Sequence, residues 1–268
     1  MKRFLVISIT FFLVPCDVFA ARSKDDYHFD EQGIQIGQNL PDLTAHLQNG
    51  ESVWLSNYYA KRLTLFVCES LTCPVARRKH PGLKEIAGRF GDRIDIVVFY
   101  TIEAHPQGDP SPYTEGEEWV TRLNRKQGVL CRQPTTLDER IKLAGRLREA
   151  VAIESTMLVD CMNNAGWRAL GAGPNVAVLV DPKGLVLAKQ GWFDPKRMAA
   201  AIKRALKKSD SAESYQHEKP RDEAQVEPKC DCQSGLSEAD EHGKTKSSDT
   251  VPEGFCRWYR TGRSEIRS

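Results

Sequence analysis

The sequence of 268 residues lacks several features that define large classes of protein. Beyond its first residues it has no apolar run near the roughly 18 residues that a membrane helix needs, so we expect no integral membrane segment after signal cleavage. Its 38 basic and 36 acidic side chains nearly cancel, which argues against a nucleic-acid partner. Eight cysteines are too few for a small domain built on disulfides. The chain is long enough to bury its own core, and we expect one domain with tails.

The N-terminus has the pattern of a secretory signal peptide. Two basic residues precede an apolar stretch from Phe4 to Val14, and we expect cleavage after Ala20, which predicts a secreted or periplasmic protein. A lipoprotein would instead use Cys16 as its lipidated residue, but Pro15 fits such processing poorly. Removing Cys16 from the eight cysteines leaves seven, an odd number in an oxidising compartment. At least one thiol is therefore free, transiently paired or bonded to another molecule.

Composition divides the rest of the chain into three parts. Residues 21–35 are polar and mostly charged, which predicts a flexible leader, and residues 36–208 contain the apolar segments of a folded domain. Residues 209–268 are polar and predict a disordered tail. The tail contains three cysteines, Cys230, Cys232 and Cys256. They are either incidental thiols, or Cys230 and Cys232 form a resolving pair; because the spacing matches no closed zinc pattern, we expect no metal.

Apolar patterning within 36–208 predicts an α/β domain. Buried strands are expected over 63–67 and 94–102, on either side of an amphipathic helix that starts after Cys73. The other expected elements are a hairpin turning at Asn49-Gly50, helices from about Glu117 and over 136–151, a strand at 155–160, a short helix at 163–170, a hairpin turning at 181–184 and a helix capped by Asp194. This order predicts a thioredoxin-like fold, with a central mixed β-sheet flanked by helices.

Cys73 is the candidate nucleophile. It lies between a predicted buried strand and a predicted helix, where free N–H groups and the positive end of the helix dipole stabilise a thiolate. Arg77, Arg78 and Lys79 add positive potential, so we expect a thiolate-forming cysteine at neutral pH.

The second cysteine of a Cys-x-x-Cys motif is missing, because Ala76 occupies its place. Cys68 lies inside the predicted strand and is either a buried inert thiol or a resolving partner that needs local rearrangement. Cys131 and Cys161 are the other possible resolving thiols within the domain.

Two more features are expected beside this thiol. A thioredoxin fold brings a proline, usually in cis, to the start of its hairpin, and Pro174 fits that place. Glu103 and His105 follow the second buried strand, at the sheet edge where α/β sites form. We expect His105 to move a proton and Glu103 to orient it.

These motifs together resemble the iodothyronine deiodinases and their bacterial deiodinase-like relatives, thioredoxin-fold proteins in which Thr and Pro flank a selenocysteine. Four segments match in family order: Leu71–Pro74, Val97–Pro106, Ser155–Asn164 and Gly173–Pro195. The resemblance implies that Cys73 stands at the selenocysteine position, between Thr72 and Pro74 as supporting residues. It also implies a role in proton supply and substrate interaction for Glu103 and His105. The sequence departs from the family at Leu71, where the family has a cysteine.

We therefore expect a thiol-dependent oxidoreductase without a cofactor. Its Cys73 would attack a disulfide sulfur, a peroxide oxygen or a halogen of a small-molecule or protein substrate, and an external thiol reductant or a resolving cysteine would restore it. A peroxiredoxin-like thiol peroxidase is the first alternative, although its motif needs Pro and Thr where Phe66 and Ser70 stand. The second alternative is a non-catalytic thioredoxin-like binding module.

Overall fold

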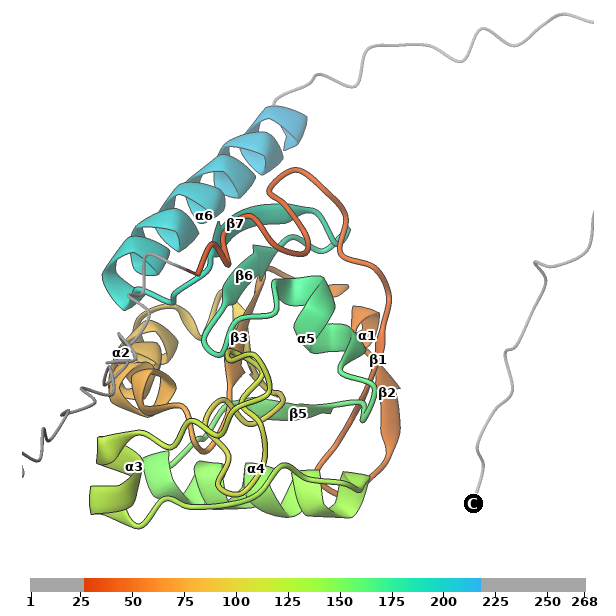
Figure 1. The fold of residues 1–268 in the computed structure, drawn as a ribbon. Coiled ribbons are helices and arrows are strands. Elements are labelled where there is room, and N and C mark those ends of the chain that lie inside the picture. Colours follow the sequence, from red (N-terminus) through yellow and green to blue (C-terminus); the bar gives the residue numbers. More distant parts are fainter. Residues whose placement is uncertain (1–26, 218–268) are drawn as a thin grey trace, which may run out of the picture. The chain divides into compact units, whose positions relative to one another are not determined.

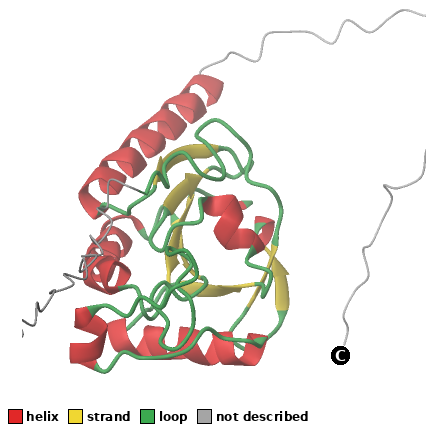
Figure 2. Cartoon of the chain, viewed as in Figure 1, coloured by secondary structure: helices red, strands yellow, loops and turns green. Residues whose placement is uncertain are grey.

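The computed structural model describes residues 27–217 (Figures 1 and 2), so the predicted signal peptide and Cys230, Cys232 and Cys256 lie outside the described residues. Its centre is a seven-stranded sheet in the order β2-β1-β5-β4-β3-β6-β7. The strands are β1 (Thr44–His46), β2 (Ser52–Trp54), β3 (Thr64–Glu69), β4 (Asp95–Tyr100), β5 (Thr156–Asp160), β6 (Ala177–Val180) and β7 (Val186–Gln190). Strands β3, β4 and β5 are parallel, and antiparallel hairpins complete both edges.

Helices cover both faces of this sheet. They are α1 (Ser56–Tyr59), α2 (Pro74–Phe90), α3 (Arg122–Gln127), α4 (Leu137–Val151), α5 (Ala165–Leu170) and α6 (Pro195–His217). Side chains of α2, α4 and α6 form one apolar core with one face of the sheet, and side chains of α1 and α5 form a second core on the other face. The domain has a thioredoxin-like fold, as the order of predicted elements indicated.

Local sequence explains where the central elements begin and end. All six residues of β3 are buried, with Leu65 in one core and Phe66 in the other, because the strand is covered on both faces. Helix α4 starts with a capping box, in which Thr136 and Glu139 each bind the other's backbone. Asp194 Oδ1 accepts a hydrogen bond from Arg197 N at 2.9 Å and caps α6.

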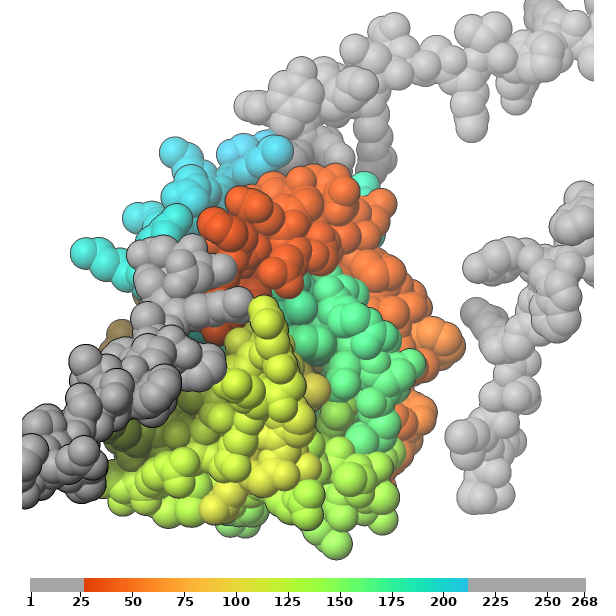
Figure 3. Space-filling view, viewed as in Figure 1, coloured from red at the N-terminus to blue at the C-terminus, as the bar shows by residue number. Residues whose placement is uncertain are grey.

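Three boundaries differ from the sequence-based expectation. The tail was predicted to be disordered from residue 209, but helix α6 continues to His217. The helix expected from about Glu117 begins at Arg122, because Thr121 Oγ1 accepts from Asn124 N and acts as its N-cap. The leader was predicted to be flexible, yet its residues 27–35 pack against the domain: Phe29 is 3 % exposed, and Ile34 N donates to Ala169 O at 2.7 Å. Figure 3 shows this red-orange segment lying against the green segment that contains α5. Although the segment is mostly polar in composition, its few aromatic and aliphatic side chains pack on the domain and order it.

No helix within residues 27–217 has both the length and the apolar character that a membrane crossing requires.

Candidate active site

Cys73 is the N-cap residue of α2 and lies just beyond the carboxyl end of β3. Its backbone is extended, its Sγ accepts a hydrogen bond from Ala76 N at 3.4 Å, and Pro74 takes the first helical position, where its missing N–H costs nothing. The predicted helix-start thiol is therefore confirmed in position.

The loop before Cys73 is fixed by buried polar side chains from two other elements. Glu103 Oε2 accepts from Thr72 N at 2.8 Å and from Thr72 Oγ1 at 2.5 Å. Asn124 Nδ2 on α3 donates to Thr72 O at 2.8 Å, and Arg77 donates to Leu71 O. Every polar group of Thr72 is thus bound, which holds the residue beside the thiol in one position.

The structure brings Glu103 and His105 to this loop but not to each other. His105 N donates to Thr72 Oγ1 at 3.0 Å, whereas its ring Nδ1 lies 3.1 Å from Trp119 O. The Glu103 carboxylate is used by Thr72 and by the Tyr100 hydroxyl. The expectation that Glu103 orients the His105 ring is therefore wrong, because the Trp119 carbonyl takes that role.

Burial determines the protonation of both groups. Burial lowers the pKa of His105 to about 4, so the imidazole is neutral at pH 7. Since Nδ1 faces a carbonyl oxygen, it carries the proton, and Nε2 has the lone pair. Burial raises the pKa of Glu103, although the donors from Thr72 and Tyr100 act in the opposite direction.

Cys73 is covered by aromatic side chains. The thiol is 1 % exposed and belongs to a buried cluster with Phe29 and Tyr113. The rings of Phe29 and Tyr113 lie edge to face at 5.6 Å between centroids, and Trp119 packs in the same way against His105 at 4.4 Å. The segment around Phe29 thus packs against the loop that carries Tyr113, and Tyr113 lies close enough to Cys73 for the two groups to interact electrostatically. We call these two segments the cover.

The cover reverses the expected acidity of Cys73. Burial raises the pKa of the thiol to about 11, and this effect outweighs the N–H groups of Ala76 and Val75 and the positive charge of Arg77, all of which lower it. The expectation of a thiolate at neutral pH is wrong for the covered arrangement. The same donors remain aimed at the sulfur and would act more strongly than burial once water reached it.

The other cysteines of the described chain are free as well. Cys68 is buried inside β3, where burial raises the pKa of its thiol strongly. Cys131 is half-buried, and burial followed by the charge of Glu103 raises its pKa too. Cys161 follows β5, two strands from β3, and its Sγ donates to Thr44 O at 3.2 Å on the side away from Cys73. None of the four is joined to another described cysteine.

Pro174 does not have the predicted geometry. No peptide bond within residues 27–217 is cis, so the Gly173–Pro174 bond is trans. The residue beside the active-site strand is instead Asn175, which is fully buried and donates from Nδ2 to Cys68 O at 3.3 Å. The asparagine side chain, rather than a cis proline, ties the start of β6 to the end of β3.

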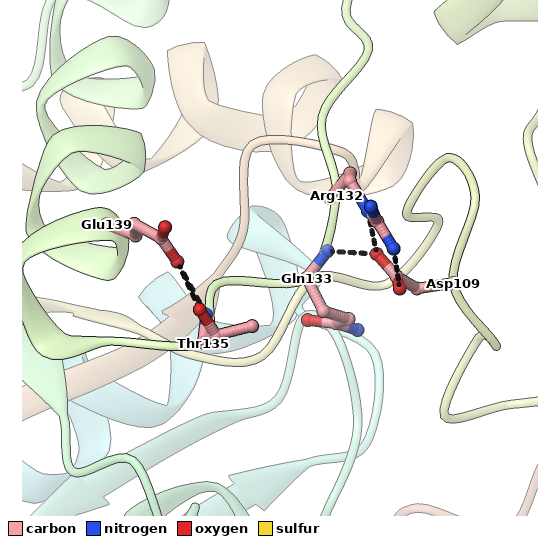
Figure 4. Close-up of polar contacts among 5 residues, drawn as sticks. All are labelled: Asp109, Arg132, Gln133, Thr135 and Glu139. Atoms are coloured by element: carbon pink, nitrogen blue, oxygen red, sulfur yellow. Dashed lines mark hydrogen bonds and ion pairs between the residues drawn. The ribbon is translucent and has the colours of Figure 1, made fainter.

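The loop that carries Tyr113 is tied to the segment before α4. Figure 4 shows Arg132 pairing with both carboxylate oxygens of Asp109, at 3.1 and 3.0 Å, while Gln133 N donates to the same carboxylate. The Gln133 side chain then bonds both the N–H and the carbonyl of Glu103, at 3.1 and 2.7 Å. These contacts anchor the base of the cover, while ring contacts and the hydrogen bond from the Tyr27 hydroxyl to Tyr113 O hold its tip.

Sequence reasoning missed the residues that shape this site from outside the motifs. Asn124 and Tyr113 lie in segments without a catalytic pattern, and Tyr100 belongs to a buried strand in which it looks like a core residue. The sequence indicated only Arg77 among the residues around the thiol. A cation one turn into a helix that starts directly after a cysteine lies close to the sulfur.

Comparison with known proteins finds no matching family model and no matching curated protein. Solved structures do match. A secreted Mycobacterium tuberculosis disulfide oxidoreductase homologous to Escherichia coli DsbE has 10 % identity and a TM-score of 0.41, over 61 % of this chain and 96 % of that one. The thioredoxin domain of a thiol-disulfide oxidoreductase from Bacteroides vulgatus has 15 % identity and a TM-score of 0.44, over 64 % and 98 %. A thiol:disulfide interchange protein from Bacteroides sp. has 15 % identity and a TM-score of 0.44, over 64 % of this chain and 90 % of that one.

Proposed function

We propose that the chain is a secreted or periplasmic thiol oxidoreductase that uses Cys73 as its nucleophile. The observation that carries this proposal is the convergence of Glu103 and His105 on Thr72, directly before a cysteine at the start of a helix. Such a rigid frame around a thiol, with two titratable side chains, is the arrangement that nucleophilic catalysis requires.

The cover must open before the thiol reacts. While it is closed, a pKa of about 11 keeps Cys73 protonated. Opening removes the burial but leaves the N–H groups of Val75 and Ala76 and the charge of Arg77, each of which lowers the pKa of the thiol. Substrate entry and thiol activation are then one event.

The proposed chemistry is disulfide exchange. His105 Nε2 accepts the proton of Cys73, and the thiolate attacks one sulfur of a substrate disulfide R–S–S–R′. The Cys73–S–S–R bond forms as the S–S bond of the substrate breaks, and the departing R′–S⁻ takes the proton back from His105. An external thiol, or a resolving cysteine such as Cys131, then attacks the Cys73 sulfur of the mixed disulfide and releases R–SH. A further external thiol reduces the disulfide that results and returns Cys73 to the thiol.

The deiodinase-like resemblance adds a second substrate class. In reductive dehalogenation the Cys73 thiolate attacks the halogen, the carbon that loses the halogen takes a proton, and a thiol reductant converts the resulting sulfenyl halide to a disulfide and a hydrogen halide. A peroxide would follow a parallel course, with a sulfenic acid at Cys73.

The complete burial of Cys73 favours one alternative, a thioredoxin-like binding module without turnover. Cys73→Ser separates the two functions. With dithiothreitol as reductant, the variant should lose turnover of a disulfide, a halogenated phenol or hydrogen peroxide, while a chain with serine at Cys230, Cys232 and Cys256 keeps it. If the protein with all its cysteines turns over none of the three substrates, or if Cys73→Ser is as active, the proposal fails.

A further inference from the structure

A second thiol lies next to an imidazole, outside the site described above. Cys161 Sγ is 3.5 Å from His46 Nε2 and 3.5 Å from Thr44 Oγ1, both on β1. Because β5 and β1 are hydrogen-bonded neighbours, with His46 opposite Val159, this approach is fixed by strand register rather than by a flexible loop.

The imidazole is itself oriented by a third group. His46 Nδ1 lies 3.3 Å from Ser52 Oγ on β2, directly across the β1–β2 hairpin. When Nδ1 donates its proton to Ser52, Nε2 presents its lone pair to the sulfur. A thiol, a base and a residue that orients the base therefore stand in line, which is the general arrangement of an activated nucleophile.

A buried cation lies on the other side of Cys161. Arg140 on α4 is 2 % exposed and donates to Cys161 O at 2.7 Å and to Asp160 O at 3.2 Å. Its hydrogen bonds in this region go to carbonyl and amide oxygens, including Asn164 Oδ1 at 2.8 Å. The Asp160 carboxylate accepts from the backbone N–H groups of Gly166 and Trp167 and also interacts with the charge of Arg140.

This group is reachable from solvent, in contrast to Cys73. Cys161 and His46 are only partly buried, and Ser52 is exposed. Trp54 pairs with Thr44 in the hairpin, on the same face as His46 and Ser52, and is 52 % exposed. An exposed indole opposite Thr44, whose hydroxyl lies 3.5 Å from the Cys161 sulfur, offers an apolar surface for a small molecule.

We infer that Cys161, His46, Ser52 and Trp54 form a second thiol-exchange site, distinct from Cys73, that reacts with low-molecular-weight disulfides and becomes S-thiolated. His46 takes the proton of Cys161, and the thiolate attacks a small disulfide R–S–S–R. The Cys161–S–S–R bond forms, the R–S–S–R bond breaks, and the second R–S⁻ leaves as R–SH with the proton from His46. The small disulfide is the oxidant, and Cys161 is oxidised.

The test follows adduct formation at each cysteine. A full-length chain with Cys230, Cys232 and Cys256 changed to serine is reduced, freed of reductant and mixed with oxidised glutathione at pH 7. Peptide mass spectrometry then gives a rate for each remaining thiol. Cys161 should react at least about tenfold faster than Cys131, given the ~100-fold or more that a positioned base typically contributes.

Two variants test the roles of the neighbours. His46→Gln should lower the Cys161 rate about tenfold or more at pH 7 and converge on the parent rate at about pH 10, where hydroxide removes the proton. His28→Gln changes an exposed histidine elsewhere and should have no effect. If His46→Gln does not fold, Ser52→Ala replaces it, because that side chain is exposed, and it should lower the rate by a smaller factor.

The inference is overturned if Cys161 reacts no faster than Cys131, or if the folded histidine variant keeps the parent rate. An unchanged rate in Ser52→Ala overturns it where that variant is used. These outcomes are independent of Cys73, since the measured adduct lies on a different cysteine.

Discussion

Tyr113 holds the cover over Cys73, and truncating it should expose the thiol. Tyr113 is 8 % exposed, and its ring packs against Phe29. Its hydroxyl accepts a hydrogen bond from Trp167 Nε1 at 3.4 Å, and it lies close enough to Cys73 and Cys68 for negative charge on either sulfur to raise the pKa of the hydroxyl. Tyr113→Ala removes these contacts while leaving the Asp109–Arg132 anchor of the loop intact. We expect the tip of the cover to open and water to reach the sulfur.

The size of the effect follows from the pKa of Cys73. Burial is the first cause that raises it from 9.0 to about 11, a difference that corresponds to about 3 kcal/mol. Loss of burial therefore increases the thiolate fraction at pH 7 by about 100-fold or more, because the N–H groups that lower the pKa stay in place. The truncation also costs stability, by about 3 kcal/mol or more for a large buried ring.

The assay is alkylation of Cys73 by iodoacetamide, with peptide mass spectrometry to follow this cysteine alone between pH 6 and about pH 11. Tyr113→Ala should react faster at pH 7, and the midpoint of its pH profile should shift downward. Tyr58→Ala, the same truncation on α1, should keep the wild-type rate and midpoint. A folded Tyr113→Ala protein with the wild-type rate and midpoint would refute the role of the cover.

Three further predictions concern stability, measured by urea unfolding. The pKa of His105 falls from 6.5 to about 4 on folding, so its contribution to the free energy of unfolding is fully present above pH 6.5 and is lost as the pH falls toward 4. In His105→Gln the free energy of unfolding should lack this decrease of about 3 kcal/mol between pH 6.5 and 4. His28→Gln, at an exposed histidine, should keep the decrease. Thr72→Val removes two buried hydrogen bonds and should cost about 2–4 kcal/mol, whereas Thr72→Ser restores most of it. Gly166→Ala places a Cβ 2.5 Å from the Phe99 ring and should cost about 1–3 kcal/mol, while Gly88→Ala, in open space on α2, should stabilise by about 0.5–1 kcal/mol.

The fold was predictable because its central elements have strong local patterns. The apolar run of β3 and the helical spacing of α4 each permit one structure, and turn residues such as Gly184, with φ of +84°, separate the strands of the hairpin. The order of these elements then leaves few topologies. Local pattern thus determined the sheet and the position of Cys73.

The protonation of the site was not predictable, because it depends on contacts between distant segments. The effect of the helix start on Cys73 can be inferred from neighbours in sequence, whereas its burial depends on Phe29 and Tyr113, which are 44 and 40 residues away in the chain. The partner of the His105 ring is a backbone carbonyl, and every residue has one, so no residue type could have indicated Trp119. Residue identity predicted the groups of the site, and tertiary packing decided their charges.

The different environments of the thiols affect how many cysteines a thiol titration detects. A colorimetric titration under native conditions reads the number of cysteines only where each one reacts within the time of the measurement. Of the four described cysteines, Cys68 and Cys73 are buried, and burial raises the pKa of Cys131 as well. Among these four, a native titration will therefore report Cys161 promptly and the other three at the pace of local opening. The difference between the number of thiols that react under native conditions and the number that react in denaturant measures how strongly the folded domain protects its cysteines from the reagent.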